Sequence, residues 1–313
     1  ACLEEIALNN KWIAKSKIND AIKFYGNCDY AKYLKKLIKF SKKKNFLMYR
    51  YLNAFYKSNF FDSLPVFLAK KIFKIFKVFF VETNLKSLPQ NNHPGSLDYE
   101  IQKQIVQNFS NKSFKPFNSC SDLLEILHQK STNKKEIKFY DFGANNIDNY
   151  LYLSSKLKKI KYFYYDKSNF NDIVNKTIRE NNLKNIIVDQ DFKLDKSDLD
   201  FVFFGSSLQY LKNYKNILNQ FIKNQTKCFI FSLTPFYDSD FKSQDVIIKQ
   251  INLHPIINYA FLINYKNFID FMLLNNYKLE SKKKNNLIKF LNFDNFDKSY
   301  KFVDVLDLVF IKS

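Results

Sequence analysis

Glycine occurs only four times in the 313 residues of this chain, so the positions of the glycines are informative. Two of the four end short apolar runs, because Gly143 follows residues 138–142 and Gly205 follows residues 199–204. Runs of this length and composition are typical of buried strands. In open α/β sheets, ligands bind beyond the carboxyl ends of the strands, where the backbone comes close to the ligand. The two glycines therefore predict a nucleotide-type crevice at one edge of a sheet.

Strand-like and helix-like segments alternate from residue 137 onward. The predicted strands lie at 137–141, 161–165, 185–189, 199–204 and 227–232, and the predicted helices lie near 147–158, 170–181 and 212–224. After an irregular stretch, a helix at 266–275 precedes strands at 277–282 and 304–311. Alternation with helical crossovers produces a mostly parallel sheet with helices on both faces. The sequence predicts an α/β, Rossmann-like sheet of the class I methyltransferase kind, with the plain dinucleotide-binding fold as its near neighbour.

Four short motifs carry a family resemblance over residues 95–313. They are Asp141-Phe142-Gly143, Gly205-Ser206-Ser207-Leu208-Gln209-Tyr210-Leu211, Thr234-Pro235-Phe236 and Ser243-Gln244-Asp245-Val246. Together they resemble a family of class I S-adenosylmethionine-dependent methyltransferases found with polysaccharide-synthesis genes. The resemblance implies S-adenosylmethionine as the cofactor and a sugar nucleotide or surface polysaccharide as the methyl acceptor.

The first two strands supply the first candidate cofactor residues. The resemblance places Asp141 opposite the methionine ammonium group, and Gly143 allows the backbone to approach the cofactor. Asp166, which closes the second strand, is expected to accept hydrogen bonds from the ribose hydroxyls, as in related dinucleotide sites. The alternative for both aspartates is a helix-capping or turn role. The family has more glycine after Gly143, and Asn145 or Asn146 is expected to replace it because asparagine tolerates left-handed backbone. A fold that has lost its cofactor is the other possibility.

The next two strand ends complete the predicted cofactor site. Asp191 and Phe192 are the candidates for the adenine amino group and the adenine face. Gly205 and Ser206 are expected beneath the reacting methyl group. Methyl transfer requires positioning and exclusion of water more than covalent help from the protein, so no strong catalytic motif is expected.

The acceptor side has weaker signals. Gln209, Tyr210 and Gln244 are predicted to face the acceptor. His254 and Tyr210 are the candidates for a catalytic role, and His254 is a possible general base for a sugar hydroxyl. A lone histidine in a loop is more often without such a role. No metal site is predicted, because the four cysteines are scattered with no CxxC pair and no histidine cluster nearby.

The N-terminal third is predicted to be separate from the sheet. Residues 1–39 contain Ala1-Cys2-Leu3-Glu4-Glu5-Ile6-Ala7, Trp12-Ile13 and Tyr30-Ala31-Lys32-Tyr33-Leu34, and they resemble the C-terminal tail of bacterial glucose-1-phosphate thymidylyltransferases. The residue pattern predicts short helices separated by turns. The catalytic part of that family lies upstream of its tail and has no counterpart here, so the resemblance implies a contact with such an enzyme and not nucleotidyl transfer. Residues 40–94 are predicted to be a basic, aromatic helical region that ends in a linker, and 95–313 the methyltransferase-like domain.

Residues 66–82 are predicted to form a basic amphipathic helix, with lysines at 70, 71, 74 and 77 on one side. Such a helix can lie at a membrane interface, which would be a peripheral contact at the inner membrane surface. The alternative is a helix that packs on the neighbouring domain with its lysines outward.

The net charge of +20 comes almost entirely from lysine, because Arg50 and Arg179 are the two arginines. Nucleic-acid sites depend on the bidentate fork of arginine, so a nucleic-acid partner is not expected. Scattered cysteines fit a reducing, cytoplasmic location. Two rival functions remain: a non-catalytic accessory of a thymidylyltransferase, or a basic RNA-binding or membrane-binding protein on a methyltransferase fold.

Overall fold

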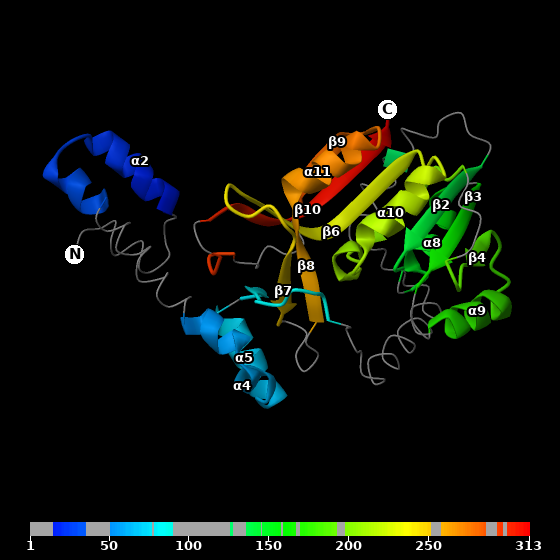
Figure 1. Cartoon of the computed structure of the whole chain (residues 1–313), viewed down its shortest axis with the longest axis horizontal. Helices are drawn as coiled ribbons and strands as arrows, with labels where there is room; N and C mark the ends of the chain where they lie inside the picture. Colours follow the sequence, from blue (N-terminus) through cyan, green and yellow to red (C-terminus); the bar gives the residue numbers. More distant parts are fainter. Residues whose placement is uncertain are drawn as a thin grey trace. The chain divides into compact units, whose positions relative to one another are not determined.

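The structure is a computed structural model of the whole chain. It describes residues 15–35, 51–76, 78–89, 126–127, 136–144, 146–157, 159–166, 170–192, 198–251, 258–285, 293–296 and 299–313. The chain divides into two compact units, Ala1–Leu64 and Pro65–Ser313 (Figure 1). The sequence also predicts helices at 98–109 and 122–129. These lie outside the described residues, apart from 126–127, which are helical.

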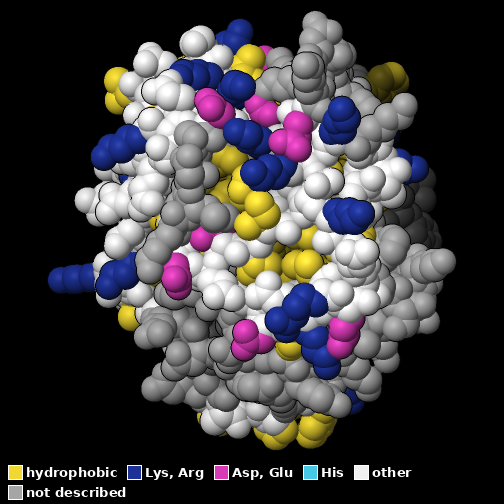
Figure 2. All heavy atoms as spheres, turned by 90° about the vertical axis from the view of Figure 1, so that its right-hand side faces the viewer, with side chains coloured by type: hydrophobic (Ala, Val, Ile, Leu, Met, Phe, Trp, Pro, Cys, Tyr) yellow, Lys and Arg dark blue, Asp and Glu magenta, His cyan; other side chains and the backbone are white. Residues whose placement is uncertain are grey.

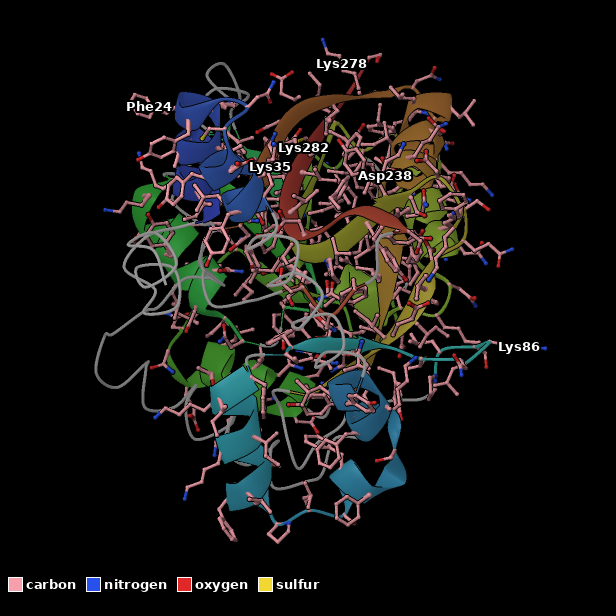
Figure 3. All side chains as sticks on the ribbon, turned by 90° about the vertical axis from the view of Figure 1, so that its left-hand side faces the viewer. Phe24, Lys35, Lys86, Asp238, Lys278 and Lys282 are labelled. Atoms are coloured by element: carbon pink, nitrogen blue, oxygen red, sulfur yellow. The ribbon has the colours of Figure 1, made fainter. Side chains whose placement is uncertain are left out.

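The first unit is helical where it is described. Helix α2 (Lys15–Tyr25) is followed by a turn at Gly26 and a second helix at 29–35, and helix 51–57 precedes α4 (Asn59–Asp62). Ile18 and Leu34 are fully buried, whereas Phe24 is 84% exposed and points outward (Figure 3). Residues 15–35 therefore have the short helices predicted for the N-terminal segment, and residues 1–14 lie outside the described part.

The second unit is built on a sheet whose strands run in the order β4-β3-β2-β5-β6 and are parallel (Figure 1). These strands are β2 (Ile137–Phe142), β3 (Ile160–Tyr165), β4 (Ile186–Val188), β5 (Phe201–Gly205) and β6 (Cys228–Ser239). Next to β6 lies β10 (Tyr300–Lys312), which is antiparallel to it, and then β9 (Tyr277–Lys284). A parallel sheet closed by a late antiparallel strand confirms the predicted Rossmann-like sheet of the class I methyltransferase fold.

Helices cover both faces of this sheet, as doubly wound connections require. Helices α8 (Asp148–Lys156) and α9 (Phe170–Glu180) bury Tyr150, Leu153 and Val174 against one face. Helices α10 (Tyr214–Lys223) and α11 (Tyr265–Leu274) bury Leu218, Phe221, Phe268 and Met272 against the other. The helices predicted near 147–158, 170–181, 212–224 and 266–275 are confirmed.

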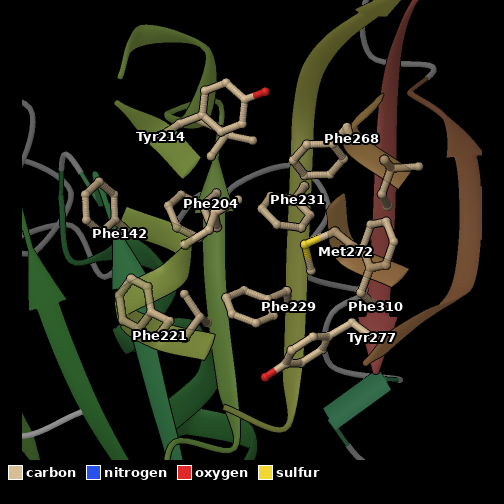
Figure 4. Close-up of a cluster of buried hydrophobic side chains, with 14 of the residues drawn as sticks. Phe142, Phe204, Tyr214, Phe221, Phe229, Phe231, Phe268, Met272, Tyr277 and Phe310 are labelled. Atoms are coloured by element: carbon tan, nitrogen blue, oxygen red, sulfur yellow. The ribbon is translucent and has the colours of Figure 1, made fainter. Parts of the chain in front are cut away.

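A row of aromatic rings crosses the strands on the α10–α11 face (Figure 4). Phe142, Phe204 and Phe231 come from three adjacent strands, and their ring centroids are 5.0 Å and 5.4 Å apart. Phe310 of β10 lies 6.0 Å from Phe231 and extends the row. Each large ring removes much apolar surface from water, so this face is the centre of the core.

The stretch between the fifth strand and α11 is not irregular, which corrects the prediction. Strand β6 continues to Ser239, and β7 (Val246–Gln250) and β8 (Asn258–Asn264) form a hairpin-like antiparallel pair beside it. The buried residues Ile248, Ala260 and Leu262 give this extension its own small core. Sequence alternation is weak there, and only pairing in the folded sheet identifies these residues as strands.

The predicted single helix over 66–82 is also wrong in its length. Helix α5 (Val66–Phe76) ends at Phe76, and residues 80–82 form β1 (Phe80–Glu82), which pairs with β7. Lys242 forms an ion pair of 2.6 Å with Glu82 and helps to fix β1. A basic, apolar run is compatible with either a helix or a strand. Residues 80–82 form a strand because they pair with β7. None of the helices in the described part of the chain has the length and apolar character needed to span a bilayer.

Candidate functional site

Aspartates lie at the carboxyl ends of three adjacent parallel strands. Asp141 is the next to last residue of β2, Asp166 follows β3 and Asp189 follows β4. Because β2 pairs with β3 and β3 with β4 in parallel, these ends share one edge of the sheet. This edge corresponds to the crevice in which ligands of open α/β sheets bind.

Asp141 is almost completely buried, with 1% of its surface exposed. Its Oδ2 accepts hydrogen bonds from Nδ2 of Asn149 at 3.0 Å and from the hydroxyl of Tyr162. Among the described residues, no hydrogen-bond partner reaches its Oδ1. Burial raises the pKa of the carboxyl from 3.8 to about 6, against the lowering effect of the two donors, and the nearby charge of Asp166 raises it further. A donor that reached Oδ1 would stabilise the charged form.

Asp166 is electrostatically coupled to the same site. Burial is the larger cause of the raised pKa of Asp141 and of the Tyr164 phenol. The negative charge of Asp166 raises both pKa values further. Its main-chain oxygen accepts a hydrogen bond from Nδ2 of Asn171, in the first turn of α9, at 3.4 Å. The structure thus brings Asp141 and Asp166 together, as the sequence predicts.

Asp189 is a site residue that the sequence analysis missed. It is 3% exposed, and its Oδ2 accepts a 2.6 Å hydrogen bond from the hydroxyl of Tyr140 in β2. Burial and this contact raise the pKa of Tyr140 far above its usual range. The signal was available, because Asp189 is the last residue of the strand predicted at 185–189, but the nearby Asp191 and Phe192 were favoured in its place.

The turn after β2 brings two segments into close contact. Gly143 has a φ of +71°, and a Cβ at this position would lie 2.6 Å from the Cβ of Ser207. The hydroxyl of Ser207 donates to the main-chain oxygen of Phe142 at 2.7 Å. The main-chain N–H groups of Gly143 and Ala144 both donate to the oxygen of Tyr165. Glycine is therefore required for the approach of Ser207, and the N–H groups of this turn already have a protein acceptor.

Phe192 does not present an open face at the strand ends. Its φ is +56°, and its half-buried ring lies 5.5 Å from Phe142, 5.2 Å from Tyr165 and 5.4 Å from Phe221. It is therefore part of the aromatic row on the α10 face. Asp191, its neighbour, is exposed.

The end of β5 leads into a compact polar turn. Gly205 is the last residue of β5, and Ser206 has a φ of +56°. The Nε2 of Gln209, in the short helix η1 (Leu208–Tyr210), donates to the main-chain oxygen of Ser206 at 3.1 Å and to its hydroxyl at 2.9 Å. Gln209 is 3% exposed, so it is buried beside the strand end rather than directed to solvent.

Of the remaining predicted site residues, the structure describes Tyr210 and Gln244 but not Asn145 and His254. The hydroxyl of Tyr210 donates to Oε1 of Gln250 in β7 at 2.6 Å. Gln244 is exposed, in the segment between β6 and β7. Asn145 and His254 lie outside the described residues, so the structure does not place them.

Charge is dispersed on the one face of the molecule that Figure 2 shows. On the face shown in Figure 2, Lys and Arg side chains lie among acidic and uncharged ones. Lys86 and Lys278 extend outward separately (Figure 3). In the described part of the chain, no three His, Cys, Asp or Glu side chains form a group able to hold a metal ion.

Comparisons with known proteins give distant structural likenesses. No protein-family model matches the chain, and no curated protein matches it in sequence. The 1,6-didemethyltoxoflavin-N1-methyltransferase of Burkholderia thailandensis, solved with S-adenosylhomocysteine, is 9% identical, with 75% of this chain and 95% of that one covered and a TM-score of 0.45. An S-adenosylmethionine-dependent methyltransferase of Clostridium acetobutylicum is 11% identical, with 69% and 99% covered and a TM-score of 0.43. An amino pentose methyltransferase of Micromonospora echinaspora is 5% identical, with 72% and 100% covered and a TM-score of 0.42. At such identities and TM-scores, the likenesses assign no function to this chain.

Proposed function

We propose that the sheet unit binds S-adenosylmethionine at the carboxyl edge of β2, β3 and β5 and transfers its methyl group to a hydroxyl or amine of a small molecule or sugar. One observation carries the proposal most directly: Asp141 keeps a buried oxygen, Oδ1, that receives no hydrogen bond from any described residue. Leaving a buried charged acceptor without a donor is costly unless a ligand supplies one. The cofactor would supply the ammonium donor and the activated methyl group.

The residues fit part of this cofactor. Asp141 would accept from the ammonium group, and Asp166, at the next strand end, would accept from the ribose hydroxyls. The N–H groups of Gly143 and Ala144 do not fit the carboxylate of the cofactor, because they already donate to Tyr165. That carboxylate must therefore be held by other groups.

The acceptor class is the finer part of the proposal. The motif resemblance supports a sugar nucleotide or a surface polysaccharide. The role of the protein in the transfer would be to align the acceptor with the methyl group and to exclude water.

The test is calorimetric titration of the whole chain with S-adenosylmethionine and with S-adenosylhomocysteine. We expect micromolar binding, weakened about 10- to 100-fold by Asp166→Ala, because a hydrogen bond to a charged group contributes about 1.5–3 kcal/mol. Asp172→Ala is the matched control, since Asp172 is an exposed aspartate in the first turn of α9. Absence of binding by the intact chain would refute the proposal.

A further inference from the structure

We infer that a buried polar cluster between η1 and the β7–β8 pair is the methyl-acceptor subsite, and that it selects a neutral, hydroxyl-bearing acceptor over a phosphorylated one. The polar cluster consists of Ser206, Gln209, Tyr210, Gln250 and Asn258. The inference rests on the proposed function and deepens it.

The hydroxyl of Tyr210 is the centre of the polar cluster. It donates to Oε1 of Gln250 at 2.6 Å, and hydrogen bonding with the side chains of Gln209 and Ser206 also acts on it. Burial raises the pKa of this phenol, and these bonds offset only part of the effect. Gln250 is directly paired with Asn258 on the adjacent antiparallel strand, so both side chains lie on the same face of the sheet.

Two acceptor oxygens in the polar cluster have no hydrogen-bond partner among the described residues. They are Oε1 of Gln209 and Oδ1 of Asn258, on side chains that are 3% and 5% exposed. The amide of Gln209 cannot be turned over without loss, because its Nε2 contacts three acceptors: the main-chain oxygen and hydroxyl of Ser206 and, at 3.5 Å, the main-chain oxygen of Leu233. Buried acceptors normally have donors, so two such oxygens together point to a ligand that supplies them.

The backbone is in an unusual conformation at two residues whose main-chain oxygens contact the side-chain amide of Gln209. Ser206 has a φ of +56° and Leu233 a φ of +51°, and neither residue is glycine. Ser206, directly after β5, and Leu233, within β6, are thus both held in the left-handed region, and both supply acceptors to the Gln209 amide. Such conformations are concentrated at ligand sites, where the surrounding structure maintains them.

The polar cluster adjoins the proposed cofactor crevice. Ser206 is a member of the polar cluster. The next residue, Ser207, lies directly against Gly143, which follows β2. A molecule bound there would lie beside the end of β5, where the methyl group is expected.

The chemistry of the polar cluster indicates what it would bind. None of its five members is charged, and Lys249 is on the opposite face of β7 because side chains alternate along a strand. The described members of the polar cluster offer no cation to a phosphate, whereas hydroxyl groups would donate to Oε1 of Gln209 and Oδ1 of Asn258.

The inference can be tested by saturation-transfer NMR with neutral methyl hexosides and with glucose 1-phosphate, each in the presence of S-adenosylhomocysteine. We expect transfer to the neutral hexosides at least fivefold stronger than to the phosphate. Asn258→Leu should abolish it, and Asn258→Asp, which keeps an acceptor oxygen, should retain it. Asn181→Leu, at an exposed position directly after α9, is the matched control.

The affinity for S-adenosylhomocysteine, measured on the same variants, separates the two proposals and reports on folding. If Asn258→Leu keeps that affinity within twofold and loses the hexoside signal, the inference is supported. If the chain binds S-adenosylhomocysteine but the hexosides give no signal, or the signal survives Asn258→Leu, or the phosphate binds as well, the inference is wrong while the proposed function stands. If S-adenosylhomocysteine does not bind to the intact chain, both are wrong.

Discussion

At the scale of single residues, Asp141 shows a conflict between stability and the proposed binding. Its carboxyl is buried and has a pKa raised from 3.8 to about 6, so the charged form is unfavourable in the folded chain. The folded state therefore binds the proton more tightly than the unfolded state does. This contribution to stability is fully present below pH 3.8 and is lost as the pH rises through 6.

The first prediction concerns Asp141→Asn, which removes this titration. Relative to the wild type, the unfolding free energy of the variant should rise by about 2 kcal/mol between pH 4 and pH 7.5. Urea denaturation at the two pH values measures it. Equal pH profiles for the two proteins would show that Asp141 does not titrate in this window.

In the wild type, affinity for S-adenosylmethionine should decrease below about pH 6, because protonation of Asp141 removes the charge that attracts the ammonium group.

The second prediction concerns Gly143→Ala. The left-handed backbone costs an alanine about 1–2 kcal/mol, and the contact with Ser207 adds to this cost, so a loss of about 2–4 kcal/mol in unfolding free energy is expected. Thermal and urea denaturation measure it. Adding Ser207→Gly should recover the steric part but not the backbone part. A contrasting position is Gly26, where a Cβ meets nothing within 4 Å. No recovery in the double variant would contradict the steric explanation.

At the scale of elements, β6 joins the parallel sheet to the antiparallel extension, and a bulge marks the transition. Ser232 and Leu233 of β6 lie opposite the single residue Asp307 of β10, where the register shifts. Oδ1 of Asp307 accepts from the hydroxyl of Ser232 at 2.8 Å, from the N–H of Leu233 at 2.9 Å and from Nδ2 of Asn285 at 2.9 Å. A bulge of this kind redirects a strand, and here it carries β6 on to β8.

The third prediction follows from this bulge. Asp307→Ala leaves the N–H of Leu233 and the Asn285 amide without their acceptor, so a loss of about 2–4 kcal/mol in unfolding free energy is expected. Asp304→Ala on the same strand is the matched control. Asp304 pairs at 2.7 Å with Lys284, whose side chain is 65% exposed, so a loss of at most about 1 kcal/mol is expected. Equal losses would show that the bulge does not depend on Asp307.

At the scale of the whole molecule, the sheet unit has a helix with an unusual outer face. On α5, Phe67 and Ile75 are 68% and 70% exposed, and Lys71 and Lys74 are exposed on the same side. Ala69 is buried on the other side. Apolar side chains between lysines are typical of a helix that lies on an anionic membrane, and the predicted contact at 66–82 stays a prediction.

The fourth prediction tests that contact. Deleting residues 66–82 would also remove β1 from the sheet, so substitution is the better design. Phe67→Ser with Ile75→Ser should abolish sedimentation with vesicles that contain phosphatidylserine, and neutral vesicles should bind weakly in either case. Lys86→Ser, a substitution of an exposed lysine outside α5, is the control for general charge. Vesicle binding that the double variant retains would refute a membrane role for α5.

The sequence by itself determined the parallel part of the fold. Residues 137–232 and 266–311 have strong periodicity and apolar strands, so local pattern was enough to predict β2–β5 and the helices between them. It also identified Asp141, Asp166 and Gly143, because residue type and position at a strand end depend on the order of the chain alone. The tertiary structure decided the rest. Residues 80–82, 246–250 and 258–264 become strands by pairing with one another and with β6, and that pairing depends on long-range contacts. The polar cluster was visible only in part, because the sequence identified Ser206, Gln209 and Tyr210. Asn258 is 49 positions away from Gln209, and only the sheet brings the two segments together.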